Sequence, residues 1–389
     1  MWKEKESLTS SYRNRCALLA LTSALVTAEM LLADNADRFP DFRPRREMPG
    51  ETFVGTEICA GCHIQKNRTQ PHTAMAHALR VPADSQVLAS HERMNFRAAP
   101  YTYEISRNGN QSTYSVSDGK ELIREPIAYV FGYAHVAETY LLRHAGKLYE
   151  GRVSYYGSIE GLDWTVGDAL NPPPSLESAL GRDISGDEAK NCFSCHGTGA
   201  VVQGKLQLEQ LVCGVTCEAC HGPGKSHVNA MRSGRGETPA IFNPRNLTAD
   251  QLSQEFCGAC HRSANVVGMM PDLGGTNNVR FQPYRLSGSR GHDSNDPHFA
   301  CTACHDPHLD LPQQGASSDA KCTICHLLAD GQSSSGKSKL QTAARPRTCP
   351  LANANCDRCH MPKIEVPGTH FKFTDHRIRV VRPGERYPI

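Results

Sequence analysis

The feature that most constrains this chain is a repeated five-residue pattern, C-x-x-C-H. It occurs seven times in 389 residues, and every C-x-x-C in the sequence is followed at once by histidine. Chance would produce seven such histidines with odds on the order of one in a billion, so the pattern has a chemical cause. The seven motifs are Cys59-Cys62-His63, Cys192-Cys195-His196, Cys217-Cys220-His221, Cys257-Cys260-His261, Cys301-Cys304-His305, Cys322-Cys325-His326 and Cys356-Cys359-His360.

The spacing within each motif suits covalent attachment of a c-type haem. Two cysteines three positions apart on a turn lie on one side of the backbone, where their sulfurs can form thioethers with the two haem vinyl groups. The adjacent histidine then presents its imidazole to the iron from the same face. The pattern therefore predicts seven covalently bound haems, with the fourteen cysteines as attachment points and the seven motif histidines as iron ligands.

Two other uses of paired cysteines fit less well. Structural zinc takes four ligands in a tetrahedron and has no need of a histidine directly after each cysteine pair. A disulfide framework would not dictate a fixed C-x-x-C-H repeat. Outside the motifs and the first 28 residues only Cys213 and Cys349 remain. They form either a disulfide or two buried thiols.

The remaining histidines are candidates for the opposite side of each iron. Eleven of the eighteen histidines lie outside the motifs, which is enough to give every haem a second imidazole. For the segment "PHTAMAHAL" we expect a helix after the first motif, and for the tail "THFKFTDHRI" we expect folding back over the haems. The predicted second ligands are His72, His77, His227, His298, His308, His370 and His376.

Other residues could take the same role. His91 and His292 are reserve candidates, whereas His135 and His144 lie in a strand-rich segment and are expected to be structural. Methionine at Met75 or Met361 is the competing ligand, and it would raise the reduction potential of its haem.

The first 28 residues have the layout of a secretory signal peptide. A basic polar start precedes an apolar run, Cys16 to Ala28, that ends in a small-residue cleavage pattern. A retained membrane anchor is the alternative, because apolar residues resume after Glu29. In both cases the rest of the chain is expected outside the cytoplasm, in the periplasm or at the extracellular surface.

The chain divides unevenly around the motifs. We expect a signal peptide at 1–28, a linker at 29–50, a first haem segment at 51–97, a β-rich insertion at 98–185 and a six-haem domain with a ligand-bearing tail at 186–389. Alternating residues on both sides of Asn108-Gly109 predict a β-hairpin, and "SLESAL" and "TADQLSQEFCGACH" predict short helices. The predicted fold class is a multihaem cytochrome c of short α-helices and loops around stacked haems, with a small antiparallel β element at about 98–165 and the haems as its apolar core.

Several stretches resemble a known family. The segments "FVGTEICAGCH", "PHTAMAHAL", "CEACHGPGKSHV", "CTACHDPH", "CDRCHMPK" and "FTDHRI" are similar to the multihaem cytochromes c related to the nitrifier tetrahaem cytochrome and hydroxylamine oxidoreductase. The resemblance covers most of residues 51 to 380. It implies closely stacked haems, mainly bis-histidine ligation and electron transfer outside the cytoplasm. Tetratricopeptide repeats, which some look-alikes carry, and the C-x-x-C-K motif of ammonia-forming nitrite reductases are not present in this sequence.

Three functions are compatible with these features. The first is electron transfer by a seven-haem carrier, with redox proteins or membrane quinol oxidoreductases as partners. The second is an oxidoreductase that acts on a small nitrogen or sulfur compound at one open haem, and the third is a subunit of an extracellular haem filament. The formal net charge of +2 gives no indication of nucleic acid binding.

Overall fold

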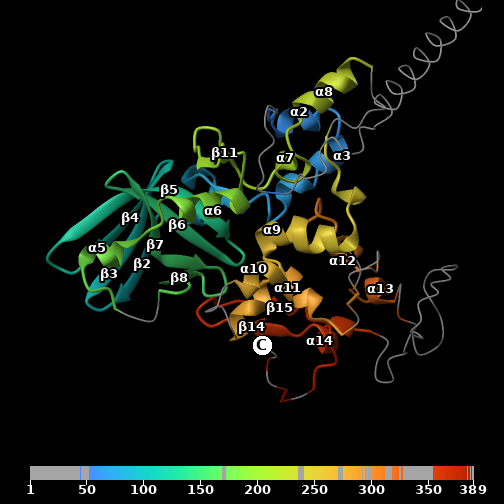
Figure 1. The fold of residues 1–389 in the computed structure, drawn as a ribbon. Helices are drawn as coiled ribbons and strands as arrows, with labels where there is room; N and C mark the ends of the chain where they lie inside the picture. Colours follow the sequence, from blue (N-terminus) through green and yellow to red (C-terminus); the bar gives the residue numbers. More distant parts are fainter. Residues whose placement is uncertain are drawn as a thin grey trace, which may run out of the picture.

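The computed structural model describes residues 44, 52–168, 172–234, 241–269, 275–290, 292–293, 296, 299–311, 318–323, 326, 354–382, 384–385 and 387. These residues form a β domain, Leu79–Asp183, and a helical half that carries the motifs (Figure 1). In Figure 1 the β domain lies to one side of a column of short helices.

The β domain is one antiparallel sheet whose strands follow one another in sequence order. The main path runs β2-β3-β4-β5-β6-β7-β8, with β1 paired to β5 and β9 paired to β7. The strands are β1 (Leu79–Arg80), β2 (Arg93–Ala98), β3 (Tyr101–Asn108), β4 (Gln111–Ser117), β5 (Leu122–Tyr133), β6 (Ala137–His144), β7 (Lys147–Tyr156), β8 (Gly161–Trp164) and β9 (Gly181–Asp183).

This sheet curls until its ends meet. Strand β5 pairs with β4 along its first half and with β6 along its second half, and the register shifts between Ile127 and Tyr129. Such a bulge bends a strand and increases its twist. Strands β2 and β8, at the two ends of the path, consequently lie against each other. Across this seam the rings of Phe96 and Trp164 make an edge-to-face contact with centroids 5.3 Å apart.

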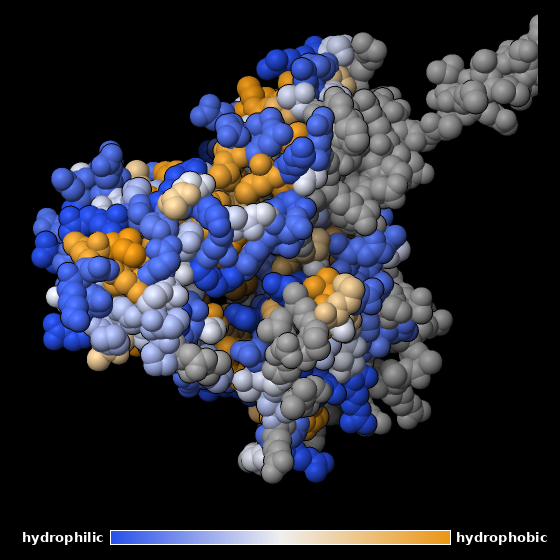
Figure 2. All heavy atoms as spheres, turned by 60° about the vertical axis from the view of Figure 1, so that its left-hand side comes forward, coloured by the Kyte–Doolittle hydropathy of each residue, from blue (hydrophilic) through white to orange (hydrophobic). Residues whose placement is uncertain are grey.

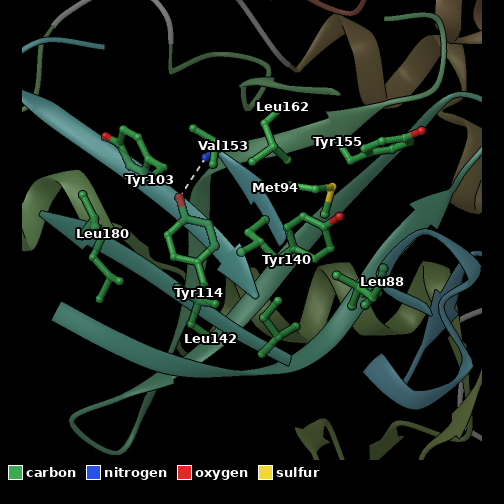
Figure 3. Packing of buried hydrophobic residues seen from close by; sticks show 14 of the residues in the cluster. Leu88, Met94, Tyr103, Tyr114, Tyr140, Leu142, Val153, Tyr155, Leu162 and Leu180 are labelled. Carbon is green, nitrogen blue, oxygen red and sulfur yellow. Dashed lines mark hydrogen bonds between the residues drawn. The ribbon is translucent and has the colours of Figure 1, made fainter. Parts of the chain in front are cut away.

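The curled sheet encloses a core of aromatic and aliphatic side chains (Figure 3). Tyr103, Tyr114 and Tyr140 are fully buried within it. The Tyr114 hydroxyl accepts a hydrogen bond from the Val153 N–H at 3.1 Å. Helices α4 (Gln86–Ser90) and α5 (Leu176–Leu180) add Leu88 and Leu180 to the same cluster.

The predicted fold class was therefore wrong in its proportions. The hairpin at 101–117 is confirmed, but the strands extend from Leu79 to Asp183 and form a large, nearly closed sheet rather than a small element. The side chains of this sheet supply their own apolar core. Part of the reason is that alternation, as in β2 with its exposed Arg93 and Arg97, indicates a single strand and does not show how many strands pair into one sheet.

The motif-bearing half consists of short helices joined by loops. They are α2 (Thr56–Ala60), α3 (Ile64–Asn67), η2 (Gln70–His72), α6 (Asp187–His196), α7 (Cys217–His221), α8 (Lys225–Arg232), η4 (Pro244–Asn246), η5 (Gln251–Cys257), α9 (Gly258–His261), α10 (Ala264–Gly268), η6 (Gly275–Arg280), α11 (Gln282–Ser287), α12 (Cys301–Cys304), α13 (Ser318–Cys322) and α14 (Cys356–His360). The 3-10 turn η3 (Pro82–Asp84) belongs to the β domain, where it packs against β4 and β5. The two predicted helical segments are confirmed as α5 and as η5 with α9. Three two-stranded ribbons complete this half: β10 (Gly197–Thr198) with β13 (Val212–Cys213), β11 (Val201–Val202) with β12 (Lys205–Leu206), and β14 (Lys363–Glu365) with β15 (Lys372–Thr374).

Two polar contacts join the halves. Arg80 of β1 donates hydrogen bonds to the carbonyl of His77 and to the fully buried carboxylate of Glu138 on β6. At the other side, His370 Nε2 hydrogen bonds Asp163 Oδ2 at 2.7 Å, and Ser158 Oγ donates to the His370 carbonyl at 2.6 Å. The loop between β14 and β15 is thereby held against β8.

No helix among the described residues is long and apolar enough to cross a membrane. The expected signal peptide, which contains Cys16, and almost all of the linker lie outside the described residues.

The His144 imidazole gives the β domain a pH dependence. Its Nδ1 lies 2.7 Å from Glu125 of β5 and its Nε2 lies 2.9 Å from Glu177 of α5. Glu125 first, and then Glu177, raise the pKa of His144 above its usual value, although burial opposes them.

The stabilisation from protonated His144 is complete below the unfolded pKa, near 6.5, and is lost as the pH rises through the raised pKa. We expect the free energy of unfolding to fall by up to about 1 kcal/mol across this window. The variant His144→Gln should lose this decrease, as measured by denaturant unfolding followed by circular dichroism. A variant with the same pH profile as the native chain would contradict the assignment, and His91→Gln is the matched control.

Candidate haem-binding centre

Each of the seven motifs includes or borders a helical turn. The sulfur-bearing and imidazole-bearing residues lie in or next to α2, α6, α7, α9, α12 and α14, and the first cysteine of the sixth motif ends α13. Residues three or four positions apart on a helix share one face. Each turn can therefore present two cysteines and the next histidine to one planar cofactor. Cys325 of the sixth motif lies outside the described residues.

Six of the seven motifs meet in pairs. The thiol of Cys59 in the first motif contacts that of Cys217 in the third. Likewise Cys257 contacts Cys301, which joins the fourth and fifth motifs. The thiols of Cys322 and Cys356 join the sixth and seventh. In Figure 1, α2 and α7 are at the top of the column, α9 and α12 in the middle and α14 at the bottom, so the three pairs follow one another along the helical half.

Three motif histidines each face a histidine from a distant segment. The ring centroids of His63 and His227 are 6.3 Å apart with an interplanar angle of 23°. Those of His221 and His308 are 6.1 Å apart at 15°. His305 and His376 are 6.1 Å apart at 37°.

This separation suits two imidazoles on opposite sides of one iron. A metal–nitrogen bond to imidazole is about 2 Å, and each ring centre lies about 1 Å behind its nitrogen, so coaxial ligands have centroids about 6 Å apart. Direct ring stacking would bring the centroids closer. The spacing of these pairs therefore fits a haem between each of them.

Hydrogen bonds at Nδ1 orient several of these rings. The Nδ1 atoms of His196, His221 and His360 lie 3.1, 3.1 and 2.9 Å from the carbonyls of Ala78, Phe242 and Arg379, respectively. Nδ1 of His308 lies 3.0 Å from Asp306 Oδ1, and Nδ1 of His376 lies 3.0 Å from the Thr374 carbonyl. A ring that donates from Nδ1 has Nε2 unprotonated and able to bind a metal.

Burial favours the neutral, ligating form of the rings. It lowers the pKa of His196, His221 and His261, and it lowers the pKa of His376 to about 4. A neutral imidazole is the form that coordinates iron. Together the spacing, the Nδ1 hydrogen bonds and the burial show that these residues fit covalent haem.

The other predicted second ligands have different surroundings. His72 is exposed on η2, which is a single 3-10 turn and not the expected helix, because the backbone becomes extended at Thr73. The His77 ring stacks on Tyr133 at 5.1 Å. His370 uses Nε2 for Asp163, as described above, and His298 lies outside the described residues. For these four residues the haem ligand role stays a prediction.

The reserve and structural candidates are held by protein groups. His91 Nδ1 lies 2.9 Å from the Val87 carbonyl, and the His292 ring contacts Phe299 edge-on. His135 makes an edge contact with Phe371. Cys213 is half-buried on β13, whereas its suggested partner Cys349 lies outside the described residues.

Glu218, within the third motif, ties that motif to the first. Its side chain is buried, and its carboxylate accepts hydrogen bonds from the N–H groups of Val54 at 2.9 Å, Gly55 at 2.8 Å and Gly224 at 2.8 Å. A carboxylate that accepts three N–H donors is held firmly in place. Sequence patterns did not single out Glu218, because the two middle positions of a C-x-x-C-H motif carry no rule of their own.

Replacing this carboxylate should loosen the start of the first motif. In Glu218→Gln an amide NH₂ would face backbone N–H donors, so we expect a loss of about 1–3 kcal/mol of stability. Hydrogen exchange at residues 52–60 should rise, while Glu57→Gln, on the exposed side of α2, should leave it unchanged. Equal exchange in Glu218→Gln and the native chain would contradict this role.

Asp375 fixes the segment that carries His376. Asp375 and its partner Arg285 are both buried, with Oδ1 2.9 Å from Arg285 Nε, and Arg379 Nη1 donates to Oδ2 at 2.7 Å. Burial by itself would raise the pKa of Asp375, but hydrogen bonds from Arg285, the Arg377 N–H and Arg379 hold it below its usual value. The tail thus folds back onto the motif-bearing half, as the sequence analysis expected.

Loss of the Asp375 charge should release His376 from His305. We expect Asp375→Asn to remove the negative charge that binds Arg285 and Arg379 and to convert one ferric haem from low spin to high spin. The measurement is electron paramagnetic resonance, with Glu385→Gln as the control because Glu385 is an exposed partner of Arg379. The native chain should show the same change on acidification, as the pH falls through the depressed pKa of Asp375. A fully low-spin Asp375→Asn spectrum would contradict the assignment.

Parts of this chain are similar in sequence to known proteins. The family described as cytochrome c554 and c-prime matches residues 174–222, which contain the second and third motifs. Cytochrome c-554 of Nitrosomonas europaea is 32% identical over 113 residues, which cover 27% of this chain and 46% of the relative. Multiheme cytochrome MtrA of Shewanella baltica is 24% identical over 212 residues, 50% of this chain and 54% of the relative. The chain thus spans about half the length of these curated relatives.

A solved structure is also similar in part. Outer cell wall cytochrome OcwA is 18% identical, with 54% of this chain and 37% of that chain covered and a TM-score of 0.32. The motifs, their helical turns and the similarity to these relatives agree. The chain is a multihaem c-type cytochrome related to cytochrome c554 and MtrA.

Proposed function

We propose that this protein transfers electrons through seven covalently attached haems outside the cytoplasm. The observation that carries the proposal is the pairing of His63, His221 and His305 with imidazoles from distant segments. An iron with histidine on both faces has no open position for a substrate, and it exchanges electrons without a change of ligands.

The pairing of motifs supports electron movement along the chain. Thiols of different motifs are in contact within each pair, so the attached porphyrins have to lie close together. The second and third of these pairs are also linked, because the fifth-motif helix α12 packs against α13 of the sixth motif. His196 and His305 lie close enough to His261 for both of them to lower the pKa of the His261 imidazole. Such a series lets an electron that enters at one haem reach another end of the protein.

The proposed location and partners rest on chemistry and on the N-terminal sequence. Covalent haem and the signal-like first 28 residues both favour an extracytoplasmic protein. The partners are proposed to be redox proteins or membrane quinol oxidoreductases, because the haems and not a bound substrate would carry the electrons.

The test is the spin state of the oxidised, haem-loaded protein. Electron paramagnetic resonance should show low-spin ferric haem throughout, and carbon monoxide should not bind the reduced protein. A native high-spin haem near one per chain would contradict the carrier and favour an oxidoreductase with one open iron.

A ligand variant calibrates this test. His308→Ala should open the iron of the third motif and create one high-spin, carbon monoxide-binding haem, since His308 faces His221. His91→Ala is the matched control, because the His91 ring bonds a backbone carbonyl and packs on Tyr155. An unchanged spectrum in His308→Ala would remove His308 from the ligand set.

A further inference from the structure

Two arginines gather beside the fourth motif. The guanidinium of Arg262, the residue after His261, lies 5.4 Å from the ring centre of Phe281. That of Arg280, at the end of η6, lies 5.6 Å from the same ring. Burial first, and repulsion from Arg262 second, lower the pKa of Arg280. Two like charges are therefore held against one aromatic ring in a partly buried place.

Arg280 lacks a partner within the protein. Within the part of the chain that the structure describes, the Arg280 guanidinium has no hydrogen bond or ion pair, and its Nε is buried. A neighbouring buried atom, Asn278 Oδ1, also has no hydrogen-bond partner. Buried polar atoms in folded proteins almost always have partners, and an unpaired buried charge is costly. Two such atoms within three residues indicate a group that the polypeptide itself does not supply.

The chemistry of the cluster selects an anion. Guanidinium groups bind carboxylates with paired, charge-assisted hydrogen bonds. The oxygen and nitrogen of an Asn or Gln side chain can exchange places by rotation, so Asn278 can present an NH₂ donor to the same point. A carboxylate would thus satisfy Arg280 and Asn278 together.

The position of the cluster selects the source of that carboxylate. Arg262 follows the motif histidine directly, and the side chain of Gln282 hydrogen bonds the His261 ring. Helix α11, which begins at Gln282, packs against α9 of the same motif. In a haem attached at Cys257 and Cys260, the propionate carboxylates are the anionic groups that long arginine side chains beside the motif could bind.

We propose that Arg262, Asn278 and Arg280 bind the propionates of the haem on the fourth motif and raise the reduction potential of that haem. This inference rests on the proposed function. Reduction adds a negative charge to the haem, and a nearby positive charge in a partly buried site stabilises that state. The fourth haem, in the middle of the series, is then reduced in preference to its neighbours.

The test is a redox titration of the haem-loaded protein and its variants. In Arg280→Gln one haem should become about tenfold harder to reduce, a shift of about 59 mV to lower potential for a one-electron couple. Its potential should also become more dependent on pH, because the uncompensated propionate takes up a proton on reduction. Arg280→Lys keeps the charge and should restore most of the native potential.

The matched control is Arg245→Gln, an exposed arginine of the same half, which should leave all potentials unchanged. A titration of Arg280→Gln that superimposes on the native curve would overturn the proposal. So would a shift of equal size in Arg245→Gln.

A second arm separates the propionate from a free anion. The native titration is repeated with added inorganic phosphate. Potentials that do not change with phosphate support the propionate, whereas a phosphate-dependent potential that Arg280→Gln abolishes would assign the cluster to a soluble anion and overturn the proposal. The proposed carrier function fails separately, through a high-spin haem in the native spectrum, which this comparison of variants does not involve.

Discussion

The helical half depends on one constraint, the placement of an imidazole from a distant segment opposite a motif histidine. Helical turns can orient two sulfurs and one histidine locally, but the second ligand has to be brought by tertiary structure. Buried polar groups do this at both ends of the column. Glu218 joins the first and third motifs through three backbone N–H groups. Asp375 and Arg285 hold the tail so that His376 faces His305.

The two halves of the protein have different kinds of core. The β domain buries tyrosines, leucines and valines inside its own curled sheet. The motif-bearing half has a small described cluster around Leu252 and Phe256, and its helix α6 adds Phe193 to a second cluster that it shares with the sheet. Large apolar side chains such as Phe53, Ile58 and Ile64 stay exposed around the first motif, and Figure 2 shows apolar surface among hydrophilic side chains on the upper part of the molecule. Flat apolar cofactors would contribute to the packing of this half.

The sequence was most informative where chemistry is local. C-x-x-C-H needs no tertiary context, so the motifs, their helical turns and the hairpin around Asn108-Gly109 could be predicted. The extent of the sheet could not be predicted. Its curvature comes from a bulge in β5 and from contacts between β2 and β8, two strands that are far apart in the sequence. The second haem ligands could be predicted only in part. His227, His308 and His376 were named as candidates, but their partners follow only from three-dimensional packing, as does the contact of His370 with Asp163.

The sequence order of the histidine pairs also constrains how the protein can mature. The first motif precedes His227 in the sequence, and the fifth motif precedes His376. In a chain that acquires haem while it is made, these two motifs would bind haem before their second imidazoles arrive. Such a chain would pass through a stage with covalently bound but incompletely ligated haems, and the contact of Asp375 with Arg285 would then protect the iron at His305 from external ligands.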